Sequence, residues 1–152
     1  MKVLLQRVRR AAVRVDGRTT SGIDAGLLAF VGVERGDSAE DATYLADKTA
    51  ELRVFPDEQG RMNRSVLETG GAVLVVSQFT LAASTRRGRR PSFTRAEDPA
   101  RAATLCDRFG ERLRERGLAV AAGVFQAHME VELINDGPVT ILLDPPPWRE
   151  AP

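Results

Sequence analysis

The chain has very few of the residues from which the common catalytic and metal sites are built. Its 152 residues include one cysteine, Cys106, and one histidine, His128. A single cysteine excludes an internal disulfide framework and any cysteine-rich zinc site. The sequence also contains no Gly-x-Ser-x-Gly elbow, no P-loop and no His-Glu-x-x-His helix. If the protein is an enzyme, it works without a conventional triad or an evident metal.

Long apolar runs are missing as well. No segment approaches the roughly 18 consecutive apolar residues of a membrane span, and polar residues enter the N-terminal segment 1–7 too early for a signal peptide. Hydrophobic residues make up 43% and charged residues 28%, which is ordinary globular composition. We expect one domain over 1–144 and a proline-rich tail, 145–152, that is disordered or lies on the surface. These features predict a cytoplasmic protein with no membrane association, metal or cofactor.

Positive charge is concentrated in one segment, although the net charge is only +1. Five arginines and no acid occur between positions 86 and 95: Arg86, Arg87, Arg89, Arg90 and Arg95. Such a run is typical of a solvated loop. A strip that binds nucleic-acid phosphates is the alternative.

The hydrophobic pattern predicts a single α+β domain with mainly antiparallel sheets and two helices packed on one face. One helix begins at Ser38, which forms a capping box with Asp41, and the other begins at Asp98. The predicted strands are 2–16, 18–23, 26–33, 72–77, about 119–124, 127–135 and 139–143. Turns are expected at Asp16-Gly17 and at 136–138.

Two polar segments stand out beside these elements. Ser77-Gln78-Phe79-Thr80 follows an apolar strand; it is either an ordinary strand end or a place where backbone N–H groups meet a ligand. The segment 135–140, Asn-Asp-Gly-Pro-Val-Thr, has the composition of a hairpin turn. Its Gly-Pro bond can be cis at modest cost. By contrast, His128 is expected on a solvated strand face and Cys106 on the apolar face of the second helix.

Taken together, these segments resemble the D-aminoacyl-tRNA deacylase family. The matching pieces extend from Gln6-Arg7-Val8 to the Asn-x-Gly-Pro-x-Thr signature at 135–140. Between them lie Val31-Gly32-Val33, Leu52-Arg53-Val54-Phe55, Val76-Ser77-Gln78-Phe79-Thr80-Leu81, Gly88-Arg89-Arg90-Pro91-Ser92-Phe93, Phe125, Ala127 and Met129. The order and spacing of the two signatures are highly specific.

The resemblance implies a homodimer whose active sites, which receive the aminoacylated 3′ end of tRNA, lie at the subunit interface. It implies that Gly137-Pro138 is cis, enters the partner's pocket and faces the substrate's α-amino group, and that Arg7 holds this pair. Ser77, Gln78, Phe79 and Thr80 would line the catalytic site. Phe125 and Met129 would lie near the adenosine pocket, and Ala127 would also bind the substrate. In this context Arg86, Arg87, Arg89 and Arg90 become candidates for tRNA phosphates.

The activity implied is hydrolysis of D-aminoacyl-tRNA and glycyl-tRNA, with L-amino acids rejected by the Gly-Pro backbone. Either the Phe79 N–H stabilises the oxyanion while the tRNA 2′-hydroxyl assists water, or Thr80 is a covalent nucleophile. Two residues depart from the family pattern: Gln126 stands in place of glycine and Ala82 in place of an aromatic residue. The remaining alternatives are a non-catalytic tRNA-binding module and an L-specific editing relative on the same fold.

Overall fold

The computed structural model describes residues 1–149, and the chain begins with a long β-hairpin. Strands β1 (Lys2–Val15) and β2 (Arg18–Ile23) pair antiparallel. Between them, Asp16 and Gly17 have φ angles of 49° and 76°. These left-handed values are those that a two-residue type I′ turn requires, so the predicted hairpin is confirmed.

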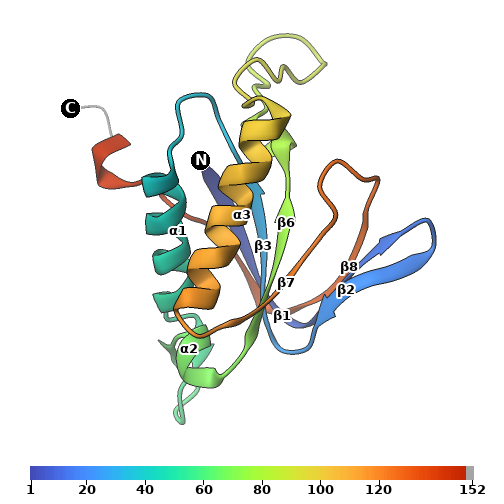
Figure 1. The fold of residues 1–152 in the computed structure, drawn as a ribbon. Coiled ribbons are helices and arrows are strands. Elements are labelled where there is room, and N and C mark those ends of the chain that lie inside the picture. Colours follow the sequence, from blue (N-terminus) through green and yellow to red (C-terminus); the bar gives the residue numbers. More distant parts are fainter. Residues whose placement is uncertain (150–152) are drawn as a thin grey trace.

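Strand β1 organises the main sheet (Figure 1). The hydrogen-bonded order is β2-β1-β3-β6-β7, and β8 also pairs with β1. The bounds of the later strands are Gly26–Gly32 for β3, Ala72–Ser77 for β6, Ala119–Ala122 for β7 and Glu130–Leu142 for β8. All pairs that β1 makes are antiparallel, but β3, β6 and β7 are parallel to one another. The expectation of mainly antiparallel pairing therefore holds around β1, whereas the parallel pairing of β3, β6 and β7 was not expected.

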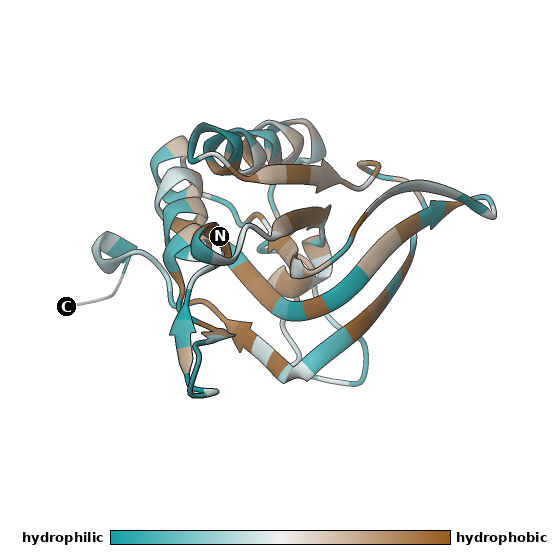
Figure 2. Cartoon of the chain, turned by 90° about the horizontal axis from the view of Figure 1, so that it is seen from below, coloured by the Kyte–Doolittle hydropathy of each residue, from teal (hydrophilic) through white to brown (hydrophobic). Residues whose placement is uncertain are grey.

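The parallel half exists because a helix connects each successive pair of its strands. Helix α1 (Ala39–Glu51) lies between β3 and β6 in the chain, and α3 (Pro99–Glu115) lies between β6 and β7. The two helices lie side by side on one face of the sheet, as predicted (Figure 1). On the side away from them the strands curl, so the sheet approaches a closed barrel (Figure 2). A third, one-turn helix, α2 (Val66–Thr69), was not predicted.

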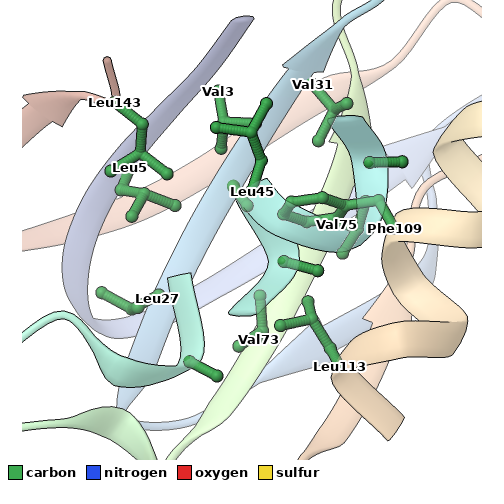
Figure 3. Packing of buried hydrophobic residues seen from close by; sticks show 14 of the residues in the cluster. Val3, Leu5, Leu27, Val31, Leu45, Val73, Val75, Phe109, Leu113 and Leu143 are labelled. Carbon is green, nitrogen blue, oxygen red and sulfur yellow. The ribbon is translucent and has the colours of Figure 1, made fainter. Parts of the chain in front are cut away.

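The main core lies between the two long helices and the sheet. Phe109 and Leu113 of α3 and Leu45 of α1 are fully buried against Val73 and its strand neighbours (Figure 3). A second apolar cluster, which includes Val8 and Leu74, fills the inside of the curled strands. The remaining elements are the short hairpin of β4 (Phe55–Pro56) and β5 (Met62–Arg64) and two 3-10 turns, η1 (Phe79–Ala82) and η2 (Pro147–Arg149). Within residues 1–149, no helix is long and apolar enough to span a membrane.

The last strand differs from the sequence prediction. We expected a hairpin turn at 136–138 between strands 127–135 and 139–143, but β8 is one strand from Glu130 to Leu142. Both of its parts pair with β1 in the same direction: Val8 faces Asn135, and Gln6 faces Thr140. One residue of β1 therefore lies opposite four residues of β8, and these bulge outward without reversing the chain. Residues 123–129, part of which we expected in a strand, form a loop.

The described part of the tail lies against the start of α1. Ser38 and Asp41 form the predicted capping box. The Asp41 carboxylate, which is fully buried, also accepts hydrogen bonds from Trp148 Nε1 at 2.8 Å and Arg149 Nε at 3.0 Å. The Trp148 ring packs edge-on against Tyr44, with 5.2 Å between centroids. Residues 150–152 lie outside the described part of the chain.

Asp41 should make folding sensitive to acid. Burial alone raises the pKa of this carboxyl, but hydrogen bonds from Arg149, Ser38 and Trp148 outweigh burial and hold it well below the usual range. A depressed native pKa stabilises the fold above the unfolded-state value of about 4, and this contribution is lost as the pH falls below it. Asp41→Asn should therefore lower the free energy of unfolding by about 2 kcal/mol at pH 7 and by less at pH 3.

Urea unfolding at the two pH values measures this difference. Glu40→Gln is the matched control, because Glu40 is exposed in the same first helical turn. An equal loss of stability at pH 7 and pH 3 for Asp41→Asn would show that the carboxylate charge has no part in the effect.

Candidate active site

The site begins where β6 ends. Gln78 donates its backbone N–H to Val31 O at 2.8 Å, and the chain then turns into η1. This turn packs directly on Gly32: a Cβ built there would lie 2.8 Å from Leu81 Cβ and 2.9 Å from Gln78 O. Gly32 is therefore needed for close approach of two backbones, a role that the sequence alone did not reveal.

The first amides of η1 have no acceptor inside that helix. In a 3-10 turn each N–H bonds to the carbonyl three residues earlier, and the Leu81 N–H reaches Gln78 O at 3.2 Å. The N–H groups of Phe79 and Thr80 precede this first bond and belong to the unsatisfied donors of a helix N-terminus. They can serve an external acceptor such as an ester carbonyl oxygen.

A cavity of about 490 Å³ opens beside this strand end. Ser77, Gln78 and Phe79 form one wall. Phe125, Ala127 and Met129, from the loop before β8, form another. The sequence-predicted strand-end and adenosine-pocket residues thus come together, with the exception of Thr80, which is not among the lining residues. The third wall was not predicted; it comes from the segment that leads into α3 and consists of Ala96, Glu97, Pro99 and Ala102.

Two backbone features shape the loop wall. Gln126 lines the cavity and has a φ of 62°, in the left-handed region that glycine adopts without strain. This explains why a glycine would suit the position. Gly123 allows Met129 to approach, because a Cβ at Gly123 would lie 2.8 Å from the Met129 sulfur. The other departure from the family pattern, Ala82, is buried at the end of η1.

No described side chain near the strand end is placed to act as a base on Thr80. The Thr80 hydroxyl accepts a hydrogen bond from the Gln78 amide, which cannot take a proton from it. His128 is exposed and does not line the cavity, as expected of a solvated residue. Cys106 is buried; burial raises the pKa of its thiol to about 11, despite a hydrogen bond with Ser77 that lowers it. This thiol is inert at neutral pH.

The Gly137-Pro138 pair lies in the bulge of β8, and its peptide bond is cis. Both residues are exposed. Arg7 braces the bulge: its Nε donates to Asp136 O at 3.0 Å, and a terminal nitrogen donates to Val54 O at 2.6 Å. Gly137 has a φ of 129°, and a Cβ there would lie 2.9 Å from the Arg7 guanidinium.

The polar ends of the Asn-x-Gly-Pro-x-Thr signature close the base of this bulge. The Asn135 side-chain Nδ2 donates to Arg7 O and to Val139 O, both at 3.0 Å, and the Thr140 hydroxyl donates to Asn135 Oδ1 at 3.3 Å. The Asn135 side chain therefore joins the two ends of the bulge to each other and to β1, and Thr140 holds that side chain in place. The sequence motif contains both residues, but the predicted hairpin turn did not indicate that their side chains would hold a bulge closed.

Within one chain the bulge and the strand end are well separated. Arg7 is level with Leu27 of β3, which is level with Val73 of β6. Ser77 lies four residues further along β6, about 13 Å at the usual rise of a strand. The bulge is also three strands away from β6 across the sheet. A single chain therefore does not bring Gly137-Pro138 together with Ser77 and Phe79.

The arginine-rich segment forms a loop at the same end of the molecule as the end of β6 (the yellow loop in Figure 1). Two backbone hydrogen bonds between Ser84 and Ser92, of 2.8 and 2.9 Å, close its base. Its four tip arginines, Arg86, Arg87, Arg89 and Arg90, are exposed. None of the four makes an ion pair with another residue in 1–149.

Comparison with known proteins identifies the family. A family model described as D-Tyr-tRNA(Tyr) deacylase matches residues 4–144. The D-aminoacyl-tRNA deacylase of Thermomicrobium roseum is 58% identical over 144 residues, covering 95% of this chain and 94% of that protein. The D-aminoacyl-tRNA deacylase of Thermotoga petrophila is 56% identical over 144 residues, covering 95% and 97%.

Solved structures agree in fold. A structure titled c-Myc DNA Unwinding Element Binding Protein is 37% identical, has a TM-score of 0.90, and the match covers 96% of this chain and 99% of that one. A structure of a probable eukaryotic D-amino acid tRNA deacylase has a TM-score of 0.80 over 93% of this chain and 97% of that one. At 17% identity this second likeness supports the fold alone.

The fold and its relatives define the class of the protein: a hydrolase that acts on an aminoacyl-tRNA ester. The chain belongs to the D-Tyr-tRNA(Tyr) deacylase family and is similar over nearly its whole length to D-aminoacyl-tRNA deacylases. The resemblance seen in the sequence is confirmed.

The left-handed backbone at Gln126 gives a stability prediction. The left-handed conformation destabilises the folded state by about 1–2 kcal/mol when the residue is not glycine. A glycine instead loses about 0.5–1 kcal/mol of stability through the greater chain entropy of the unfolded state. Gln126→Gly should therefore raise the free energy of unfolding by about 0.5–1 kcal/mol, measured by urea denaturation. Ala127→Gly is the control; Ala127 has no left-handed φ and should lose stability. A loss of stability in Gln126→Gly would contradict the strain assigned to this position.

Proposed function

We propose that the protein cleaves D-aminoacyl-tRNA in the cytoplasm by positioning the ester and stabilising its oxyanion, without a side-chain nucleophile. The terminal adenosine occupies the 490 Å³ cavity against Phe125 and Met129, which places the ester carbonyl beside the Phe79 N–H. The adjacent 2′-hydroxyl assists a water molecule, which attacks the carbonyl carbon. The bond to the tRNA 3′-oxygen breaks, this oxygen takes up a proton, and the amino acid leaves as its acid.

The observation that carries this proposal is the free amide edge at the end of β6, next to a cavity of nucleoside size. An aminoacyl ester is already activated, so oriented donors and a nearby hydroxyl supply much of what its hydrolysis requires. The surroundings of Thr80 support the same mechanism, because its hydroxyl meets an amide donor and no base.

Thr80→Ala tests the choice between the two mechanisms. If Thr80 is not a nucleophile, kcat on D-tyrosyl-tRNA should fall less than about tenfold, because the Phe79 and Thr80 amides remain. Single-turnover kinetics measures the chemical step, and Thr80→Ser serves as the conservative control. A loss of a thousandfold or more in a folded Thr80→Ala protein would establish Thr80 as the nucleophile and overturn the RNA-assisted mechanism.

We further propose that two copies of the chain assemble so that the bulge of one enters the cavity of the other. The separation of the bulge from the strand end within one chain supports this arrangement. So does the exposure of Gly137 and Pro138 on a bulge that Arg7 and Asn135 fasten from beneath. In the dimer the carbonyls of this pair hold the ammonium group of the substrate.

Chiral selection follows from this arrangement. With its ammonium group fixed, an L-amino acid directs its side chain into the Gly137-Pro138 backbone, whereas a D-amino acid directs it outward. Glycine has no side chain to exclude and is therefore released from tRNA as well. Steric exclusion by main chain rejects one enantiomer without regard to what the side chain is.

Deacylation of D-tyrosyl-, L-tyrosyl- and glycyl-tRNA tests the proposed selectivity. We expect turnover of the first and third and none of the second. Arg7→Lys keeps the charge but loses the fork that reaches Asp136 O and Val54 O, so the ratio of kcat/KM for D- over L-tyrosyl-tRNA should fall about tenfold or more. Arg9→Lys is the control: Arg9 is largely exposed and contacts the bulge only through a 3.7 Å ion pair with the Asp136 carboxylate, which a lysine can also make. An unchanged ratio in Arg7→Lys would remove Arg7 from chiral selection.

The arginine loop is the proposed contact with tRNA beyond the terminal nucleotides. Its four exposed arginines carry positive charge that no carboxylate within residues 1–149 neutralises by an ion pair. Phosphate contacts of this kind add affinity without base specificity and weaken with salt.

The second candidate is a non-catalytic nucleic-acid-binding protein. The 37% identical structure bears the name of a DNA-unwinding-element binding protein, which favours this possibility. A pure binder has no need of free amides next to a nucleoside-sized cavity. The deacylation assay separates the two, because a binder would retain D-tyrosyl-tRNA without releasing tyrosine.

A further inference from the structure

A pair of aromatic rings lies exposed just outside the cavity. Phe79 is 56% exposed and Phe93 is 36% exposed. Their ring centroids are 5.1 Å apart and the rings are inclined by 62°. Neither ring belongs to the two apolar clusters of the core, so the fold does not require them there. Exposed, adjacent aromatic faces are a typical surface for stacking a nucleic-acid base.

The two rings face a second hollow that continues the first. Arg35 and the first residues of α3 complete its walls. The hollow shares Phe79, Ala96, Glu97 and Pro99 with the 490 Å³ cavity, so the two are contiguous. A chain whose last nucleoside fills the cavity can therefore pass its preceding nucleotide directly over the rings.

One arginine, Arg35, lines this hollow, and the arginine loop begins beside Phe93. The Arg35 side chain is exposed, and within residues 1–149 its guanidinium donates one hydrogen bond, from Nε to Ala96 O at 3.3 Å. Phe93 directly follows Ser92, which closes the base of the arginine loop. The two acids in the wall already have partners: Glu97 pairs with Arg101 at 3.2 Å, and Asp98 accepts the Ala100 N–H at 3.1 Å as the cap of α3.

We propose that this hollow binds the nucleotide that precedes the terminal adenosine in the single-stranded end of tRNA. Its base stacks on the Phe79–Phe93 pair, and Arg35 contacts the phosphate that joins it to the adenosine. The proposal rests on the proposed function, in which the adenosine fills the adjoining cavity. Because stacking uses the face of a base and not its edges, the hollow accepts any base at this position.

Esters of increasing length test the proposal. D-tyrosyl-adenosine and D-tyrosyl-CpA differ by the one nucleotide in question. We expect kcat/KM to be roughly tenfold higher for the dinucleotide, and D-tyrosyl-UpA to behave like D-tyrosyl-CpA. Phe93→Leu should reduce this ratio to near one, whereas Phe93→Tyr keeps a ring and should preserve it. Arg35→Gln should lower the ratio and weaken its dependence on salt.

Binding of free adenosine and CpA, measured by calorimetry on the same variants, provides a readout that does not need hydrolysis. If CpA binds no more tightly than adenosine to the unaltered protein, the hollow is not a nucleotide site, even when the esters are cleaved. If CpA binds more tightly but no D-ester is cleaved, the hollow is confirmed and the proposed function fails. A Phe93→Leu protein that loses its dimer in sedimentation, with an unchanged preference for CpA, would assign the rings to the subunit interface and overturn the proposal.

Discussion

Hydrogen bonding of one long strand to three others is the constraint on which the rest of the structure depends. β1 pairs with β3 and then with β2 through successive parts of its length, and with β8 along nearly all of it. Because β8 is held at both ends by the same strand, its additional residues have no path except outward. The Gly137-Pro138 bulge is thus a consequence of register, and Arg7, the single residue opposite it, braces it in place.

The parallel pairing of β3 with β6 is the second constraint on the structure. Its register brings Val31 level with Ser77, so that the chain leaves β6 against Gly32 and turns at once into η1. The free amides of Phe79 and Thr80, one wall of the cavity and the position of the Phe79 ring all result from the turn of the chain from β6 into η1. The loop before β8 then completes the cavity with Phe125 and Met129.

Much of this arrangement was predictable from local patterns. The capping box at Ser38, the proline after Asp98 and the Asp16-Gly17 turn each fix an element through contacts among near neighbours, and all three were identified. The bulge at 136–139 was not, because Asn, Asp, Gly and Pro suit a hairpin equally well. Only pairing with β1, more than a hundred residues away, decides between the two.

The same distinction applies to the site. The strand end and the Phe125–Met129 loop were assigned through the family resemblance, and the structure brings them to one cavity. The sequence did not predict the cavity wall formed by the start of α3, nor the roles of Gly32 and Asn135. Their contribution is to allow or fasten contacts between backbones that are distant in sequence, and no local pattern of residue types carries that information.

The close packing of the η1 turn on Gly32 has an evolutionary implication. If main-chain groups perform the chemistry, selection acts on the residues that shape the main chain more strongly than on side chains with reactive groups. Drift at an exposed residue outside the cavity, such as His128, would then be tolerated for longer than the addition of a single methyl group at Gly32, under the turn that follows β6. A search for distant members of such a family would do better to follow its glycines than its nucleophiles.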